Sequence, residues 1–188
     1  DLVVSPATTQ RLQMVVTQAK KRPEKDCNLR SAGIVPYGKG VSALFYGPSG
    51  TGKTMAAQAV ANELGLSLWR VDLSQILDKY IGETEKHLSQ VFTAASHQNT
   101  LLFFDEADAL FGKRSEISSS HDRYANIETS FLLQQIEAYD GIVLLATNLY
   151  KNFDPAFLRR INIIIRFSMP DAALRKELWE KALPPDSF

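Results

Sequence analysis

Residues 47–54 read Gly-Pro-Ser-Gly-Thr-Gly-Lys-Thr, a glycine-rich loop between two segments with different hydrophobic patterns. The run before it, 41–46, is apolar and predicts a buried strand. The segment after it, 54–64, has small and apolar residues at helical spacing and is followed by Gly65, a natural helix C-cap. The loop is therefore expected where a strand passes into a helix N-terminus, the setting in which such a motif is meaningful.

Each residue type in this loop suits the binding of phosphate. Glycines at 47, 50 and 52 let successive backbone N–H groups turn toward phosphate oxygens at a helix N-terminus. Lys53 adds a mobile positive charge for the β- and γ-phosphates, and the Thr54 hydroxyl is placed to ligate Mg²⁺. A chance glycine-rich turn is the alternative, and the complete motif in this setting argues against it. The predicted nucleotide-binding residues are Gly47, Pro48, Ser49, Gly50, Thr51, Gly52, Lys53, Thr54 and Met55.

Two carboxylates follow another apolar run. Residues 100–104 predict a buried strand that ends in Asp105 and Glu106, at the edge where open parallel sheets bind ligands. Asp105 is suited to bind Mg²⁺ through water alongside Thr54, and Glu106 to polarise the water that attacks the γ-phosphate. An acidic pair that only caps the next helix is the alternative, and the neighbouring phosphate loop argues against it.

Length and composition limit the class of protein. A chain of 188 residues with 45% hydrophobic content and zero formal net charge is expected to form one soluble globular domain. Zero net charge gives no support to broad electrostatic binding of nucleic acid or of an anionic membrane. Cys27 is the only cysteine, which favours a reducing, cytoplasmic location. No apolar stretch approaches the length of a membrane span, and the abrupt ends predict a domain cut from a longer protein.

Strand and helix patterns alternate along the chain. Strands are expected at 41–46, 66–71, 100–104, 141–146 and 163–167. Helices are expected at 8–21, 54–64, 83–96, 125–139 and, as a short turn, 155–160. This alternation predicts an α/β fold in which helices cover both faces of a parallel sheet. The polar, serine-rich stretch 111–124 interrupts the pattern and is expected to be a functional or mobile loop.

Three further groups of residues have a functional and a structural interpretation. Asn148 follows the fourth strand, where its amide would lie beside Asp105 and Glu106 and hold the attacking water, although asparagine is also a common turn residue. Arg159 and Arg160 come too far along the chain to be assumed part of the same site. They either serve the site of a neighbouring subunit or are solvated charges at a helix C-terminus.

Tyr80 and Ile81 lie on a loop that ends at Gly82. These two side chains either pack in the interior or are exposed and hold a partner, and the sequence leaves both alternatives open. The three histidines have no metal-ligand spacing with one another or with Cys27, so a zinc site is not expected.

Taken together, these residues resemble the AAA+ ATPases, within the AAA subgroup that includes katanin-like and endosomal-sorting disassembly enzymes. The resemblance extends from residue 41 to 171 and implies ATP and Mg²⁺ as cofactors and a five-stranded parallel sheet of order 5-1-4-3-2. It implies that Lys53 and Thr54 are Walker A residues, Asp105 and Glu106 the Walker B pair, and Asn148 the sensor-one residue.

The same resemblance implies roles between subunits and toward a partner. Arg159 and Arg160 correspond to arginine fingers, Tyr80 with Ile81 to the first pore loop, and 111–124 to the second pore loop. It implies the following division of the chain: an N-terminal helix and connector at 1–40, an ATPase core at 41–170, and the start of a truncated helical lid at 171–188.

A narrower resemblance rests on 111–116, 121–126 and 139–141, which are similar to bacterial AAA+ proteins encoded with phage-tail-like contractile injection particles. It implies a role in assembling or terminating such a particle. Two departures from the family argue against hydrolysis by this chain alone. Residues 161–163 read Ile-Asn-Ile where many relatives have further basic residues, and the chain ends before the sensor-two arginine of the lid.

The sequence therefore predicts an ATP-hydrolysing core that forms a homo-oligomeric ring, expected to be a hexamer, and remodels or threads a protein partner. One alternative is a nucleotide-gated scaffold with little turnover, against which the intact Asp105 and Glu106 argue. Another is a nucleic-acid remodeller such as a helicase loader, against which the aromatic loop and neutral net charge count.

Overall fold

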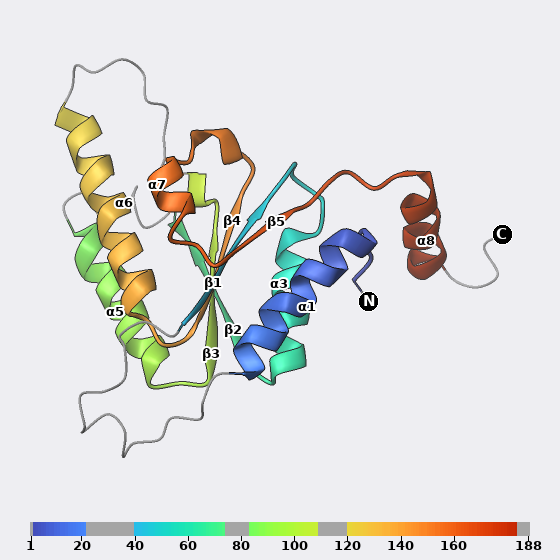
Figure 1. The fold of residues 1–188 in the computed structure, drawn as a ribbon, viewed down its shortest axis with the longest axis horizontal. Helices are drawn as coiled ribbons and strands as arrows, with labels where there is room; N and C mark the ends of the chain where they lie inside the picture. The colour runs from blue at the N-terminus through green and yellow to red at the C-terminus, as the bar shows by residue number, and fades with distance from the viewer. Residues whose placement is uncertain (1, 22–39, 74–82, 109–119, 184–188) are drawn as a thin grey trace.

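The sheet is the centre of the fold. The computed structural model describes residues 2–21, 40–73, 83–108 and 120–183 (Figure 1). Within them the chain forms a five-stranded sheet of order β2-β3-β4-β1-β5, and all its pairings are parallel, which confirms the predicted order. The strands are β1 (Val41–Tyr46), β2 (Ser67–Asp72), β3 (Thr100–Asp105), β4 (Ile142–Thr147) and β5 (Ile163–Arg166).

Helices cover both faces of this sheet, as predicted. On one face lie α1 (Pro6–Lys20) and α3 (Lys53–Leu64), and on the other α5 (Thr84–Ser96), α6 (Ser120–Ala138) and the short α7 (Pro155–Leu158) (Figure 1). A 3₁₀ turn, η2 (Tyr150–Asn152), follows β4. The last helix, α8 (Ala172–Ala182), stands apart from the sheet and has no buried residue. Within the described part of the chain, every helix is too short or too polar to span a membrane.

The strands divide their side chains between two cores, because successive residues of a strand point to opposite faces. In β3, Leu101 and Phe103 join the core beneath α1 and α3, whereas Leu102 and Phe104 join the core beneath α5 and α6. All four side chains are fully buried. A strand with apolar residues at every position, as the sequence showed, is therefore explained by burial on both faces.

One predicted boundary is wrong. Helix α6 begins at Ser120, five residues before the predicted start at 125, so the stretch predicted as a loop over 111–124 is helical from 120 onward. Serine and aspartate were interpreted as loop residues, but they are also the residues that favour the start of a helix. The other predicted helices and strands begin and end within two residues of the observed positions, whereas η2 and α8 were not predicted as elements. Residues 111–119 lie outside the described residues.

Asn162, which occupies a position where many relatives have basic residues, has a structural role. Asn162 precedes β5, and its Oδ1 accepts hydrogen bonds from the Ser42 backbone N at 2.8 Å and from Ser42 Oγ at 3.0 Å. The Asn162 backbone N in turn donates to Ser42 Oγ at 3.1 Å. These bonds attach the start of the edge strand β5 to the first residues of β1.

Candidate nucleotide-binding site

The glycine-rich loop connects the end of β1 to the start of α3, where the sequence placed it. Gly47 and Gly52 have φ values of 148° and 91°, which side-chain-bearing residues rarely adopt. A Cβ atom on Gly47 would also overlap the carbonyl oxygen of Phe167, so this end of the loop lies directly against the chain after β5. The loop is held internally as well, because Thr51 Oγ1 donates to the Pro48 carbonyl at 2.8 Å.

Lys53, which the sequence predicted as a mobile charge for the phosphates, has three hydrogen-bond partners in the structure. The residue is only 9% exposed, and its Nζ donates to the carbonyls of Gly47 and Pro48 and to Asn148 Oδ1, each at 2.8 Å. Burial lowers the pKa of Lys53, and the negative charges of Asp105 and Asp108 oppose that shift. The ammonium group is therefore fixed between the loop and the end of β4.

The carboxyl end of β3 carries the predicted acidic pair. Asp105 accepts hydrogen bonds on both oxygens, from the Glu106 backbone N to Oδ1 at 3.0 Å and from Arg70 Nη2 to Oδ2 at 2.7 Å. Glu106 has a φ of 53°, the only positive value of a non-glycine residue among those described. Such backbone strain costs on the order of 1 kcal/mol or more and is concentrated at functional sites. Glu106 is exposed, which leaves its carboxylate accessible to water.

The prediction placed the amide of Asn148 beside Asp105 and Glu106, and in the structure this amide contacts Lys53. The side-chain oxygen of Asn148 accepts from Lys53, and its backbone N donates to Asp108 Oδ1 at 3.3 Å. The same Asp108 oxygen accepts from Thr147 Oγ1 at 2.9 Å. Asp108 therefore connects the end of β3 to the end of β4, and through Asn148 to the lysine of the loop.

Sequence reasoning missed Asp108, Thr147 and Arg70. Asp108 carried a usable signal, since it lies three residues after Asp105 in the same polar segment. Arg70 carried none, because its contact with Asp105 depends on how β2 and β3 are paired.

The residues at this edge fit a magnesium ion bound together with a nucleotide. Among the described residues, no group of three or more His, Cys, Asp or Glu side chains could hold a metal ion. Mg²⁺ keeps several waters and is bound through one or two protein oxygens plus substrate phosphates. A hydroxyl from Thr54, in the first turn of α3, and the carboxylate of Asp105 match that requirement in number and in chemistry.

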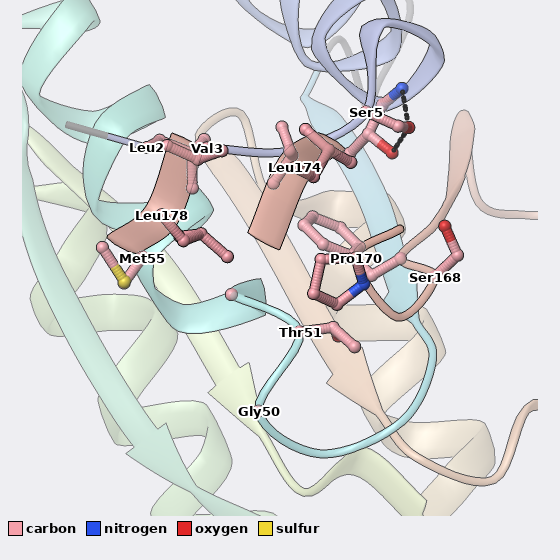
Figure 2. A pocket seen from close by; sticks show the side chains of 14 residues that line it. Leu2, Val3, Ser5, Gly50, Thr51, Met55, Ser168, Pro170, Leu174 and Leu178 are labelled. Atoms are coloured by element: carbon pink, nitrogen blue, oxygen red, sulfur yellow. Dashed lines mark hydrogen bonds between the residues drawn. The ribbon is translucent and has the colours of Figure 1, made fainter. Parts of the chain in front are cut away.

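A mostly apolar pocket of about 100 Å³ lies beside the loop (Figure 2). Three segments form it: residues 2–8 at the start of the chain and of α1, residues 50–55 of the loop and α3, and residues 167–178 around the start of α8. Met55, from the predicted set of binding residues, lies in its wall and is 58% exposed. The pocket was not predicted, because nothing in the sequence indicates that Leu2 and Leu178 line the same space.

The two arginines lie elsewhere. Arg159 directly follows α7, and Arg160 Nε lies 3.5 Å from Glu137 Oε1 on α6. Both arginines are exposed, and α7 packs on the face of the sheet opposite α3 (Figure 1). The structure does not bring them to the glycine-rich loop. The predicted pore-loop residues Tyr80 and Ile81 lie outside the described residues.

Comparison with known proteins places these observations in a family. Residues 43–169 match the family model described as "ATPase family associated with various cellular activities (AAA)". An uncharacterized AAA family ATPase, y4kL, of Sinorhizobium fredii is 35% identical over 175 residues, which are 93% of this chain and 51% of the relative. A 26S proteasome regulatory subunit 4 homolog of Encephalitozoon cuniculi is 39% identical over 155 residues, 79% of this chain and 36% of the relative.

A third relative is spastin of Drosophila erecta, which is 33% identical over 194 aligned residues, 97% of this chain and 24% of the relative. The chain thus spans about half or less of the length of these relatives.

Proposed function

Because the chain belongs to the AAA family of ATPases, we propose that it binds ATP with Mg²⁺ at the glycine-rich loop and hydrolyses the γ-phosphate. The observation that carries the proposal is the position of Lys53 Nζ, which lies against the loop carbonyls and Asn148 Oδ1. A fixed ammonium group, the N-terminus of α3 and a pair of carboxylates thus meet at one edge of the sheet.

In this proposal each residue has a separate role. Lys53 exchanges hydrogen bonds to the loop carbonyls for bonds to the β- and γ-phosphates, because its three donors are all used in this structure. Thr54 and Asp105 hold the magnesium ion that the nucleotide brings. Glu106 polarises the attacking water, and Asn148 orients that water from the end of β4. Magnesium, when bound, would neutralise the negative charge that develops on the transferred phosphoryl group.

The pocket beside the loop is the site proposed for the nucleotide base. It is mostly apolar and adjoins Gly50, Thr51 and Gly52, so a base stacked there would place its phosphates on the loop. Burial of the exposed Met55 under the base would remove apolar surface from water.

We further propose that the chain works in a homo-oligomeric ring, expected to be a hexamer, with Arg159 and Arg160 completing the site of the neighbour. Their exposure, and their position on the face opposite α3, support a role between subunits. One relative is named as a homolog of a 26S proteasome regulatory subunit. The ring would remodel or thread a protein partner by means of Tyr80 and Ile81 in the cytoplasm. We expect no membrane span and no nucleic-acid partner.

A role in assembling or terminating a contractile injection particle is the most specific form of this proposal. Its support is the resemblance of 111–116, 121–126 and 139–141 to proteins encoded with such particles. Co-purification of the protein with the products of neighbouring genes would test it, and repeated recovery without any particle component would count against it.

The experiment that tests hydrolysis is a comparison of wild-type protein with Glu106→Gln. The glutamine keeps the shape of the side chain but cannot act as a base, so phosphate release should fall about a hundredfold or more while ATP affinity stays within about twofold. Fluorescent-nucleotide titration and phosphate release are measured on the same samples. Equal losses of affinity and rate would assign Glu106 a structural role, and wild-type binding without turnover would favour the scaffold alternative.

A further inference from the structure

Arg70 contacts the carboxylate that is proposed to hold magnesium. It lies on β2, the edge strand of the sheet, and its Nη2 donates to Asp105 Oδ2 at 2.7 Å. In the β2–β3 register Arg70 is opposite Phe103, which is two residues before Asp105. Residues two apart on a strand share a face, so Arg70 and Asp105 form a diagonal cross-strand pair on the face that α3 covers.

Stability is a poor explanation for this pair. The Arg70 side chain is 60% exposed and that of Asp105 is 15% exposed. An ion pair with one exposed partner contributes little to folding, since water and salt screen it and the long side chain loses conformational freedom. What the guanidinium does change is the electrostatic potential around the carboxylate that it touches and the orientation of that carboxylate.

The pair leaves the carboxylate able to bind a further ligand. Asp105 Oδ1 accepts from the Glu106 backbone N, and Oδ2 accepts from Arg70. A carboxylate has about four lone-pair sites, so each oxygen can still accept from a metal-bound water. The two bonds together fix the direction in which those remaining sites point.

The charges around Asp105 are unequally distributed. Glu106 and Asp108 add two carboxylates to the same end of β3, and Asp72 on β2 lies opposite Asp105 in the register. The ammonium of Lys53 is bonded to the loop and to Asn148, whereas Arg70 is in direct contact with Asp105. A positive charge in that position repels a free divalent cation and attracts an anion.

We propose that Arg70 is a positioning residue that makes the site select magnesium bound to nucleotide over magnesium alone. This inference rests on the proposed function, in which Asp105 holds the metal. Free Mg²⁺ carries two positive charges and is opposed by Arg70, whereas the Mg²⁺–ATP complex is a net anion and is favoured by it. Removal of the guanidinium therefore has opposite effects on the two ligands, which loss of a merely structural contact would not have.

The test compares Arg70→Met, which removes the charge and keeps most of the apolar stem, with Arg70→Lys, which keeps the charge. Binding of Mn²⁺ alone to the nucleotide-free protein is measured by electron paramagnetic resonance, and binding of a fluorescent ATP analogue in Mg²⁺ by titration. Arg70→Met should bind Mn²⁺ about threefold to tenfold more tightly and the analogue about twofold to fivefold more weakly, and Arg70→Lys should stay near wild type. Both effects should shrink as salt concentration rises.

Arg11→Met, at an exposed position on α1, is the matched control because it changes the net charge by the same amount. Should Arg70→Met fail to fold, Arg70→Gln replaces it with the same expectations. Unchanged or weaker Mn²⁺ binding, or shifts of both ligands in the same direction, would overturn the proposal. If the wild-type protein binds no nucleotide, the proposed function is refuted. The Mn²⁺ titration still decides separately whether Arg70 opposes a cation at Asp105.

Discussion

The phosphate loop and the turn that follows α7 both present cations, and the chain holds them in opposite ways. Lys53 is 9% exposed, and its Nζ donates three hydrogen bonds of 2.8 Å. The Arg160 side chain is 51% exposed and has a 3.5 Å ion pair with Glu137, whose side chain is itself 49% exposed. A cation that acts within its own chain can be fixed by that chain, whereas one that acts on a neighbour has to stay accessible.

Physical chemistry gives the two arrangements different consequences. Charge interactions in a buried, water-poor site are several times stronger than those on the surface. A surface ion pair contributes about 0–1 kcal/mol and is easily exchanged for another partner. Mutations in the two regions should therefore differ both in size and in the property that they change.

The largest expected effect belongs to the exposed region. Arg159→Ala combined with Arg160→Ala should bind nucleotide normally but lose hydrolysis by about a thousandfold or more, because the charge proposed to stabilise the neighbour's transferred phosphoryl group is gone. Phosphate release measured against protein concentration tests this, since a site shared between subunits works only in the assembly.

Mixed rings provide the decisive control for this prediction. Combining the double arginine mutant with Lys53→Ala subunits should restore part of the activity, because an intact loop can then face intact arginines. No recovery, in mixtures that size measurements show to co-assemble, would refute the assignment to a neighbour. So would activity that persists undiminished in the monomer.

Lys53→Ala should act on affinity instead. Loss of a charge-assisted contact of about 1.5–3 kcal/mol would weaken nucleotide binding about tenfold to a hundredfold, independently of protein concentration. Titration with a fluorescent ATP analogue checks this. Unchanged affinity would show that the backbone of the loop alone holds the phosphates.

The same lysine predicts a dependence on pH. Burial lowers the pKa of Lys53 below the ordinary 10.5, so the ammonium is charged at pH values below this lowered pKa and loses its proton as the pH rises through it. Nucleotide affinity should therefore decrease with rising pH before an ordinary lysine would titrate. Lys53→Ala, which has no proton to lose there, should not show that decrease.

A smaller effect is expected at Asp108, which accepts hydrogen bonds from Thr147 and Asn148. Asp108→Ala leaves the Thr147 hydroxyl and the Asn148 N–H without their acceptor, a loss of about 1–2 kcal/mol that should reduce hydrolysis about tenfold. Asp108→Asn keeps an acceptor oxygen and should retain most of the rate. Equal rates for the alanine and asparagine variants would remove Asp108 from the group of positioning residues.

The smallest effect should follow from Glu137→Ala. Because this glutamate meets Arg160 at 3.5 Å with both side chains about half exposed, its removal should change the free energy of unfolding by less than about 0.5 kcal/mol. Denaturant unfolding measures this, with hydrolysis expected to stay at the wild-type level. A decrease in the free energy of unfolding by more than about 1 kcal/mol would mean that the ion pair with Glu137 fixes Arg160 in place. Arg160 would then not differ from Lys53 in this respect.

Local pattern was sufficient for the elements of this fold. Apolar runs, helical spacing and the glycine-rich loop each depend on neighbours in the sequence, and they placed the strands within one residue of their observed bounds. The start of α6 was misplaced for the same reason, since a serine run is typical both of a loop and of a helix start. The parallel arrangement followed from the alternation of strands and helices, and the sheet order from the family resemblance.

The sequence by itself determined that a glycine-rich loop leads into a helix that starts with Lys53 and Thr54, and that two carboxylates stand at the end of a buried strand. These features depend only on residue types at short, fixed spacings, so they can be identified without knowing how the rest of the chain folds. Only the tertiary structure decided that Asp105 pairs with Arg70, that Asn148 contacts Lys53, and that Leu2 and Leu178 line one pocket. Those contacts join residues far apart in the chain, so they depend on strand register and helix packing, to which every part of the sequence contributes at once.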